Sequence, residues 1–106
     1  MTEAPEPPVD LPPLQRATLD DARLDELFSD IEQAAEHVEI VVKRHAEGYV
    51  GEETASLSLA DARTLLAKRS VLGVQLRYRF RGAVWWDTLM VIPEGVELIR
   101  VEQRAP

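Results

Sequence analysis

The chain has 106 residues, of which 45% are apolar and 29% charged, a composition that predicts one globular domain and excludes collagen-like, mucin-like and wholly disordered chains. Twelve basic and nineteen acidic residues give a formal net charge of −7, a field that repels a nucleic-acid duplex or an anionic membrane. The absence of cysteine excludes disulfide scaffolds, zinc ribbons, iron–sulfur centres and thiol catalysis, and predicts a cytoplasmic protein.

The N-terminal segment, residues 1–17, is rich in proline and holds five of the seven prolines. Because proline fixes φ and has no N–H to donate, we expect an extended tail outside a single domain of residues 18–106. Val9, Leu11 and Leu14 lie among these prolines. Two interpretations stay open: a disordered leader, or a docking peptide that loses little entropy on binding because it is already extended.

An amphipathic helix is predicted from about Leu19 to His37, with Thr18 as its N-cap. Its apolar residues recur at spacings of three and four and form one stripe: Leu24, Leu27, Phe28, Ile31, Ala34 and Ala35. The opposite face is acidic. Residues 18–40 carry eight acidic side chains and one arginine, so this region alone has a charge of −7.

The segment 38–44 changes its pattern and is rich in β-branched residues, which predicts a strand. The alternative is that the preceding helix continues through it for two more turns. Residues 46–56 contain Gly48 and Gly51, and this composition favours a loop.

A second helix is predicted from Ser58 to about Arg69. Ser58 is placed to cap it, and Asp61 completes the spacing of a capping box. Ala62, Leu65 and Leu66 form its buried face, and Gly73 is expected to end it.

The last third of the chain alternates between apolar and polar residues, which is the period of a half-buried strand. It predicts three antiparallel strands over residues 74–81, 84–92 and 96–103. The first two are joined by a two-residue turn at Arg81-Gly82 or Gly82-Ala83, and the last two by a three-residue loop, Pro93-Glu94-Gly95.

This register assigns every strand residue to one of two faces. The predicted core face holds Val74, Leu76, Tyr78, Phe80, Trp85, Asp87, Leu89, Val91, Ile99 and Val101. The second face mixes aromatic, aliphatic and basic residues, as protein interfaces do. Its candidate partner-binding residues are Arg77, Arg79, Trp86, Met90, Leu98 and Arg100. Arg77 or Arg79 is expected opposite Trp86, which suits a cation–π contact. The alternatives to a partner surface are a solvated face with arginine stems lying over Trp86, and burial by another segment of the chain.

Asp87 stands out because the register puts its carboxylate on the core face near Tyr78. A buried carboxylate needs hydrogen-bond partners or a raised pKa. The functional hypothesis is an acid in a small pocket near Tyr78, Asp87 and His45. The structural hypothesis, which we favour, is a hydrogen bond to the Tyr78 hydroxyl or to a turn amide.

Signatures of other chemistry are missing. The two histidines, His37 and His45, have no metal-site spacing, and we expect no metal and no cofactor. Charged residues interrupt the chain too often for a transmembrane helix or a signal-peptide core. Residues 61–81 carry six basic side chains and one acid, so Arg77, Arg79 and Trp86 could bind a single nucleic-acid strand. The acidic helix region opposes this.

Together these patterns predict an α+β domain in the order α-β-α-β-β-β, with two helices on one face of a mainly antiparallel sheet of three to four strands. The leading functional hypothesis is a non-catalytic protein–protein interaction module that binds a protein partner or itself. Ten of the twelve basic residues are arginine, which is typical of a GC-rich bacterial genome and suggests a small bacterial accessory or regulatory subunit. The alternatives are a ligand-binding domain or enzyme at Tyr78 and Asp87, and a single-strand nucleic-acid binder.

Overall fold

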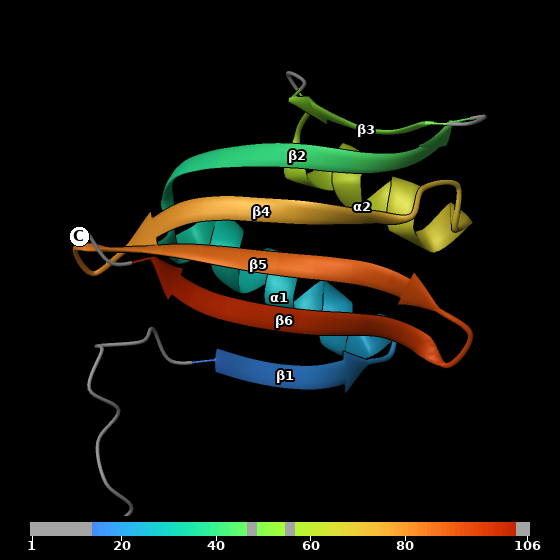
Figure 1. The fold of residues 1–106 in the computed structure, drawn as a ribbon. Helices are drawn as coiled ribbons and strands as arrows, with labels where there is room; N and C mark the ends of the chain where they lie inside the picture. Colours follow the sequence, from blue (N-terminus) through green and yellow to red (C-terminus); the bar gives the residue numbers. More distant parts are fainter. Residues whose placement is uncertain (1–13, 47–48, 55–56, 104–106) are drawn as a thin grey trace, which may run out of the picture.

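The protein was analysed as a computed structural model that describes residues 14–46, 49–54 and 57–103. In this part of the chain two helices and six strands follow one another: β1 (Leu14–Leu19), α1 (Asp21–Ala34), β2 (Glu36–Ala46), β3 (Tyr49–Thr54), α2 (Leu59–Lys68), β4 (Gly73–Phe80), β5 (Ala83–Ile92) and β6 (Gly95–Gln103). The strands form one antiparallel sheet in the order β1-β6-β5-β4-β2-β3. Both helices lie on the same side of this sheet (Figure 1). The predicted α+β class is confirmed.

The sheet is larger than the predicted three to four strands because it includes β1 and β3. β1 pairs with β6 from Leu14↔Val101 to Leu19↔Val96, so the predicted domain boundary after residue 17 falls inside a strand. β3 lies in the segment predicted as a loop and pairs with β2. Each is an edge strand with one neighbour for its backbone hydrogen bonds. Each is also only six residues long, so its sequence shows too little alternation to predict a strand. The predicted tail residues Val9 and Leu11 lie outside the described residues.

The first helix begins two residues later than predicted. Asp20 is its N-cap, and its Oδ1 accepts a hydrogen bond from the amide of Arg23 at 2.9 Å, whereas Thr18 belongs to β1. The helix ends at Ala34 and β2 starts at Glu36, so the alternative of a helix continuing through residues 38–44 is wrong. The β-branched side chains of that segment prefer a pleated strand.

The second helix confirms the predicted capping box between Ser58 and Asp61. Its end differs from the prediction. Arg69 adopts the left-handed cap conformation, with φ of 54°, and Gly73 instead begins β4. The Arg69 guanidinium donates hydrogen bonds to the carbonyls of Ile92 and Gly95, on either side of the β5–β6 turn. These bonds explain why an arginine occupies a position that usually favours glycine.

The two hairpin turns decide which side chains face the helices. Phe80 pairs with Ala83, which confirms a two-residue turn at Arg81-Gly82. Ile92 pairs with Gly95, so the second turn is also two residues long, and the predicted three-residue loop is wrong. A change of one residue in loop length inverts every side chain of the following strand.

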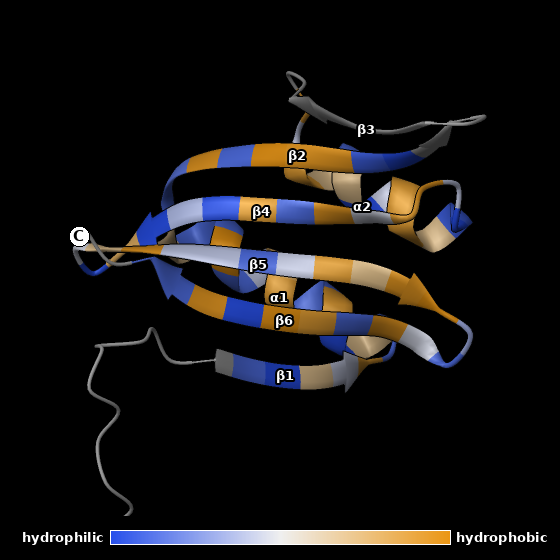
Figure 2. Cartoon of the chain, viewed as in Figure 1, coloured by the Kyte–Doolittle hydropathy of each residue, from blue (hydrophilic) through white to orange (hydrophobic). Residues whose placement is uncertain are grey.

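The corrected register reverses the faces of β6. Val96 and Leu98 are buried beneath the helices, whereas Ile99 and Val101 lie on the uncovered face. The core includes helix residues Leu24, Phe28, Ile31, Ala62 and Leu66 and strand residues Ile40, Val42, Val74, Leu76, Tyr78, Leu89, Val96 and Leu98. Hydrophobic side chains of β6 therefore lie on both faces of the sheet, and hydrophobic and hydrophilic stretches follow one another along this strand (Figure 2). In the described part of the chain, no helix is long and apolar enough to cross a membrane.

Candidate functional site

A buried polar triad lies under the first helix, formed by Asp87 of β5, Tyr78 of β4 and Arg100 of β6. Asp87 is fully buried, with 0% of its surface exposed. Its Oδ2 accepts hydrogen bonds from the Tyr78 hydroxyl and from Arg100 Nη2, each at 2.8 Å, and its Oδ1 accepts one from Arg100 Nε at 2.8 Å. The carboxylate is therefore both charge-compensated and hydrogen-bonded, as a buried charge has to be.

The predicted hydrogen bond between Asp87 and Tyr78 is confirmed, whereas Arg100, which was predicted on the second face, joins them as the third member. Asp87 pairs directly with Arg100 across β5 and β6. The expected placement of Leu98 and Arg100 on the second sheet face is wrong, because the β5–β6 turn has two residues. The missed signal was the parity of that turn: a two-residue Pro93-Glu94 loop brings an arginine opposite a buried aspartate.

Tyr78 and Arg100 hold their protons more tightly in the triad than in water. Burial, with a further contribution from the Asp87 carboxylate, raises the pKa of the Tyr78 hydroxyl far above its ordinary value of 10.0. The hydrogen bond to Asp87 raises the pKa of Arg100. At neutral pH this cluster is therefore a neutral phenol beside a closed ion pair.

The raised pKa of Tyr78 predicts a loss of stability in alkali. In the unfolded chain Tyr78 ionises near pH 10, whereas in the folded chain it stays protonated to a higher pH. Its contribution to the free energy of unfolding is therefore complete below pH 10 and declines as the pH rises above it. The free energy of unfolding should fall by up to about 1.4 kcal/mol per pH unit above 10 from this group. Denaturant titrations from pH 9 to 11 should show a shallower decline for Tyr78→Phe, and equal slopes would contradict the assignment.

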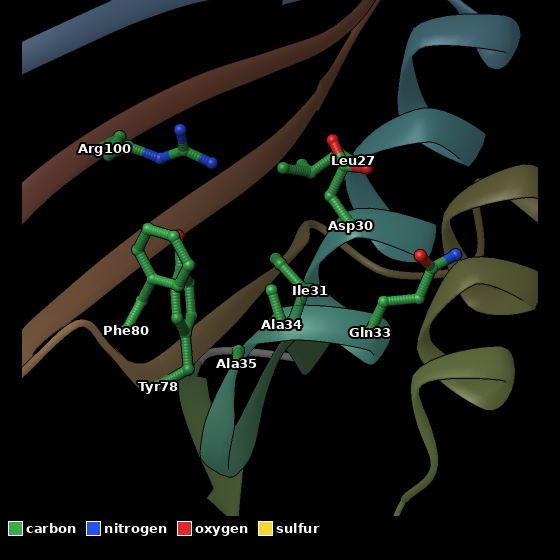
Figure 3. A pocket seen from close by; sticks show the side chains of 9 residues that line it. All are labelled: Leu27, Asp30, Ile31, Gln33, Ala34, Ala35, Tyr78, Phe80 and Arg100. Atoms are coloured by element: carbon green, nitrogen blue, oxygen red, sulfur yellow. The ribbon is translucent and has the colours of Figure 1, made fainter.

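A pocket of about 410 Å³ opens beside the triad, between the C-terminal half of α1 and the sheet. Figure 3 shows Arg100, Tyr78 and Phe80 on one wall and α1 on the other. Of the predicted constellation, only Tyr78 lines the pocket; Asp87 lies behind its partner Arg100, and His45 lies elsewhere. That residue pairs with Val50 at the far end of β2, whereas Tyr78 lies near the start of β2, between the Glu36 and Glu39 pairings.

The uncovered face of the sheet carries the predicted arginine–tryptophan contact. Arg77 pairs with Trp86 across β4 and β5, and its guanidinium carbon lies 4.2 Å from the indole centroid. Arg77 Nε also donates to Gln75 at 2.7 Å, and Nη1 lies 3.6 Å from Glu39. These contacts hold Arg77 flat against the ring.

Partly exposed apolar side chains surround this contact. They come from β5 and β6 and comprise Val84, Met90, Ile92, Ile99 and Val101. A shallow groove of about 260 Å³ runs beside Trp86 and is lined by His37, Glu39, Arg77, Tyr78, Arg79, Val84 and Trp86. Arg79 is exposed at its rim. The structure thus brings Arg77, Arg79 and Trp86 together, places Met90 on the same face, and removes Leu98 and Arg100 from it.

Within the described residues, no group of three or more His, Asp or Glu side chains is placed to hold a metal ion. Comparisons of the chain with family models, with curated proteins and with solved structures found no match. The fold and its two sites define an α+β protein with a one-sided antiparallel sheet, a mixed apolar and basic outer face, and a separate pocket on the helix side.

Proposed function

We propose that the protein is a non-catalytic interaction module, a small cytoplasmic accessory or regulatory subunit of a bacterium, whose open sheet face binds a protein partner. The observation that carries this is the Arg77–Trp86 stack in a field of partly exposed aliphatic side chains beside a groove. Aromatic residues, methionine and arginine are enriched in the binding centres of interfaces.

The groove indicates the chemistry of the partner. Its apolar wall, Val84 and Trp86, suits an inserted aliphatic or aromatic side chain. Arg79 at the rim supplies a positive charge, whereas Arg77 already lies near Glu39. We therefore propose a partner segment with an apolar anchor next to a carboxylate.

Single-strand nucleic acid is the weaker candidate. One face of Trp86 is occupied by the Arg77 guanidinium, which takes a surface that a base would stack on. The neighbouring side chains are aliphatic rather than aromatic, and the chain carries a net charge of −7. Phosphate binding would have to overcome that field.

We expect Trp86→Ala to weaken partner binding by roughly 30-fold, since truncating a central interface tryptophan costs about 2 kcal/mol or more. The immobilised full chain is used to capture its partner from an extract of the cells that produce it. The partner is identified by mass spectrometry, and its affinity for each variant is then measured by calorimetry, with circular dichroism to confirm folding.

Arg79→Glu should also weaken partner binding, and Arg23→Glu on α1 is its matched control. Both substitutions change the net charge by the same amount at exposed positions, one on the sheet face and one on the helix side. Equal loss of partner binding in Arg79→Glu and Arg23→Glu would contradict the proposal. Partner binding by Trp86→Ala at the wild-type level would also contradict it. Salt-sensitive binding of a single-stranded oligonucleotide that depends on Trp86 would support the nucleic-acid alternative.

The proline-rich segment is a second proposed contact, through Val9, Leu11 and Leu14. The deletion that tests it has to stop at residue 13, because Leu14 already pairs with Val101 in the sheet. Weaker capture by this truncated chain would support a docking role, and unchanged capture would assign all binding to the folded domain.

A further inference from the structure

The pocket between α1 and the sheet is distinct from the proposed partner-binding face, because it opens on the helix side. Its volume of about 410 Å³ lies within the range of small-molecule sites. Aliphatic and aromatic side chains form most of its lining: Leu27, Ile31, Ala34, Ala35, Tyr78 and Phe80. Its polar groups are few and lie on opposite walls.

On the sheet wall, Arg100 is a preorganised hydrogen-bond donor. Asp87 holds its Nε and Nη2 in a two-point contact, and Asp87 is itself fixed by Tyr78. This contact uses the Nε–Nη2 edge of the guanidinium, so Nη1 points away from the Asp87 carboxylate. The Arg100 side chain is 27% exposed and projects toward α1 across the pocket (Figure 3). An acceptor that enters here meets a guanidinium whose rotamer is already fixed, so little entropy is lost.

On the helix wall, the electrostatics favour a cation. Asp30 lines the pocket and forms no ion pair with the described residues. The last turn of α1 contains no basic residue, and its final carbonyls carry the negative end of the helix dipole. A carboxylate alone would meet Asp30, and an amine alone would leave the Arg100 donors unused.

We propose that this pocket binds a free α-amino acid with a large apolar side chain. Its carboxylate accepts hydrogen bonds from Arg100, and its ammonium group faces Asp30 and the end of α1. Its side chain packs on Leu27, Ile31 and Phe80. A zwitterion with an apolar body is the class of ligand that matches all three parts of the lining.

The test uses three related ligands with the full chain: L-phenylalanine, phenethylamine, which lacks the carboxylate, and 3-phenylpropionate, which lacks the amine. Binding is followed by ¹⁵N NMR, with the amides of Ala34, Tyr78 and Phe80 as reporters. We expect phenylalanine to bind at these amides at least about tenfold more tightly than either analogue, since each charge-assisted hydrogen bond contributes that much. Equal binding of an analogue, or no shift at these amides, would overturn the proposal.

Three substitutions on α1 separate the ammonium contact from a general loss of charge. Asp30→Asn should weaken phenylalanine binding about tenfold, whereas Glu32→Gln removes an exposed acid of the same helix outside the pocket lining and should change nothing. Asp30→Lys should reverse the preference and favour 3-phenylpropionate. If phenylalanine binds Asp30→Asn and the wild type equally, the ammonium does not face Asp30 and the assignment fails.

Discussion

Asp87→Ala should lower the free energy of unfolding by about 3–5 kcal/mol, the usual cost of breaking a buried ion pair from one side. The substitution leaves the Arg100 guanidinium and the Tyr78 hydroxyl in the interior without their shared acceptor. It also opens a cavity at a position that is 0% exposed. Denaturant unfolding followed by circular dichroism measures the loss, and a change below about 1 kcal/mol would contradict the role of Asp87 as the centre of the triad.

A variant that removes all three polar groups tests the cause of that loss. Tyr78→Phe, Asp87→Leu and Arg100→Met together should keep the free energy of unfolding within about 2 kcal/mol of the wild type, because well-packed apolar residues replace buried ion pairs at little cost. A combined variant as unstable as Asp87→Ala would mean that lost packing, rather than unpaired polar groups, causes the destabilisation. If the combined variant unfolds with nearly the wild-type free energy, the triad is not needed for stability, and its role is to fix the geometry of Arg100.

Gly73→Ala should destabilise the protein by about 3 kcal/mol or more, at the upper end of overpacking effects. A Cβ at this position would lie 2.4 Å from the carbonyl oxygen of Leu89 and 2.7 Å from the Met90 sulfur. The first neighbour is backbone in the centre of the sheet, so it cannot move aside without breaking the pairing of β4 with β5. Thermal and denaturant unfolding measure the effect.

Gly82→Ala is the matched control, because it tests conformation without crowding. A Cβ there meets no atom within 4 Å, but the residue has a φ of +79°. The expected cost is about 1–2 kcal/mol, that of a left-handed residue with a side chain. If Gly73→Ala costs no more than Gly82→Ala, the close approach of Leu89 to Gly73 does not limit the sheet.

The elements with a strong repeating pattern were predicted from the sequence. The apolar stripe of α1, the capping box of α2 and the alternation of β4 each reflect local chemistry, in which side-chain spacing matches the period of the element. The edge strands β1 and β3 were missed because their strand character comes from the neighbour that supplies their hydrogen bonds. For Leu14–Leu19, that neighbour is β6, about 80 residues further along the chain.

In the two candidate sites, too, contacts that depend on local pattern were predicted, and contacts that depend on pairing between distant segments were not. Arg77 and Trp86 belong to adjacent strands joined by a two-residue turn, and their contact followed from that turn and the alternation of the strands. The pairing of Asp87 with Arg100 depends on the second turn. The sequence predicted a loop there that is one residue longer than the observed one, and this error exchanged the two faces of β6. The sequence offered a pocket near Tyr78 as a hypothesis but could not give its lining, because the pocket forms where Arg100 and Phe80 of the sheet meet the end of α1.

By itself, the sequence determined the α+β class, the amphipathic helices, the C-terminal meander and the burial of Asp87 beside Tyr78, since these depend on residues close together in the chain. Tertiary structure alone decided the six-stranded sheet, the position of Arg100 beneath α1 and the lining of the pocket there. The physical reason is that local periodicity specifies which side chains share a face of one element. Which faces meet depends on turn parity and on pairing between distant segments, and a single residue in one turn is enough to reverse it.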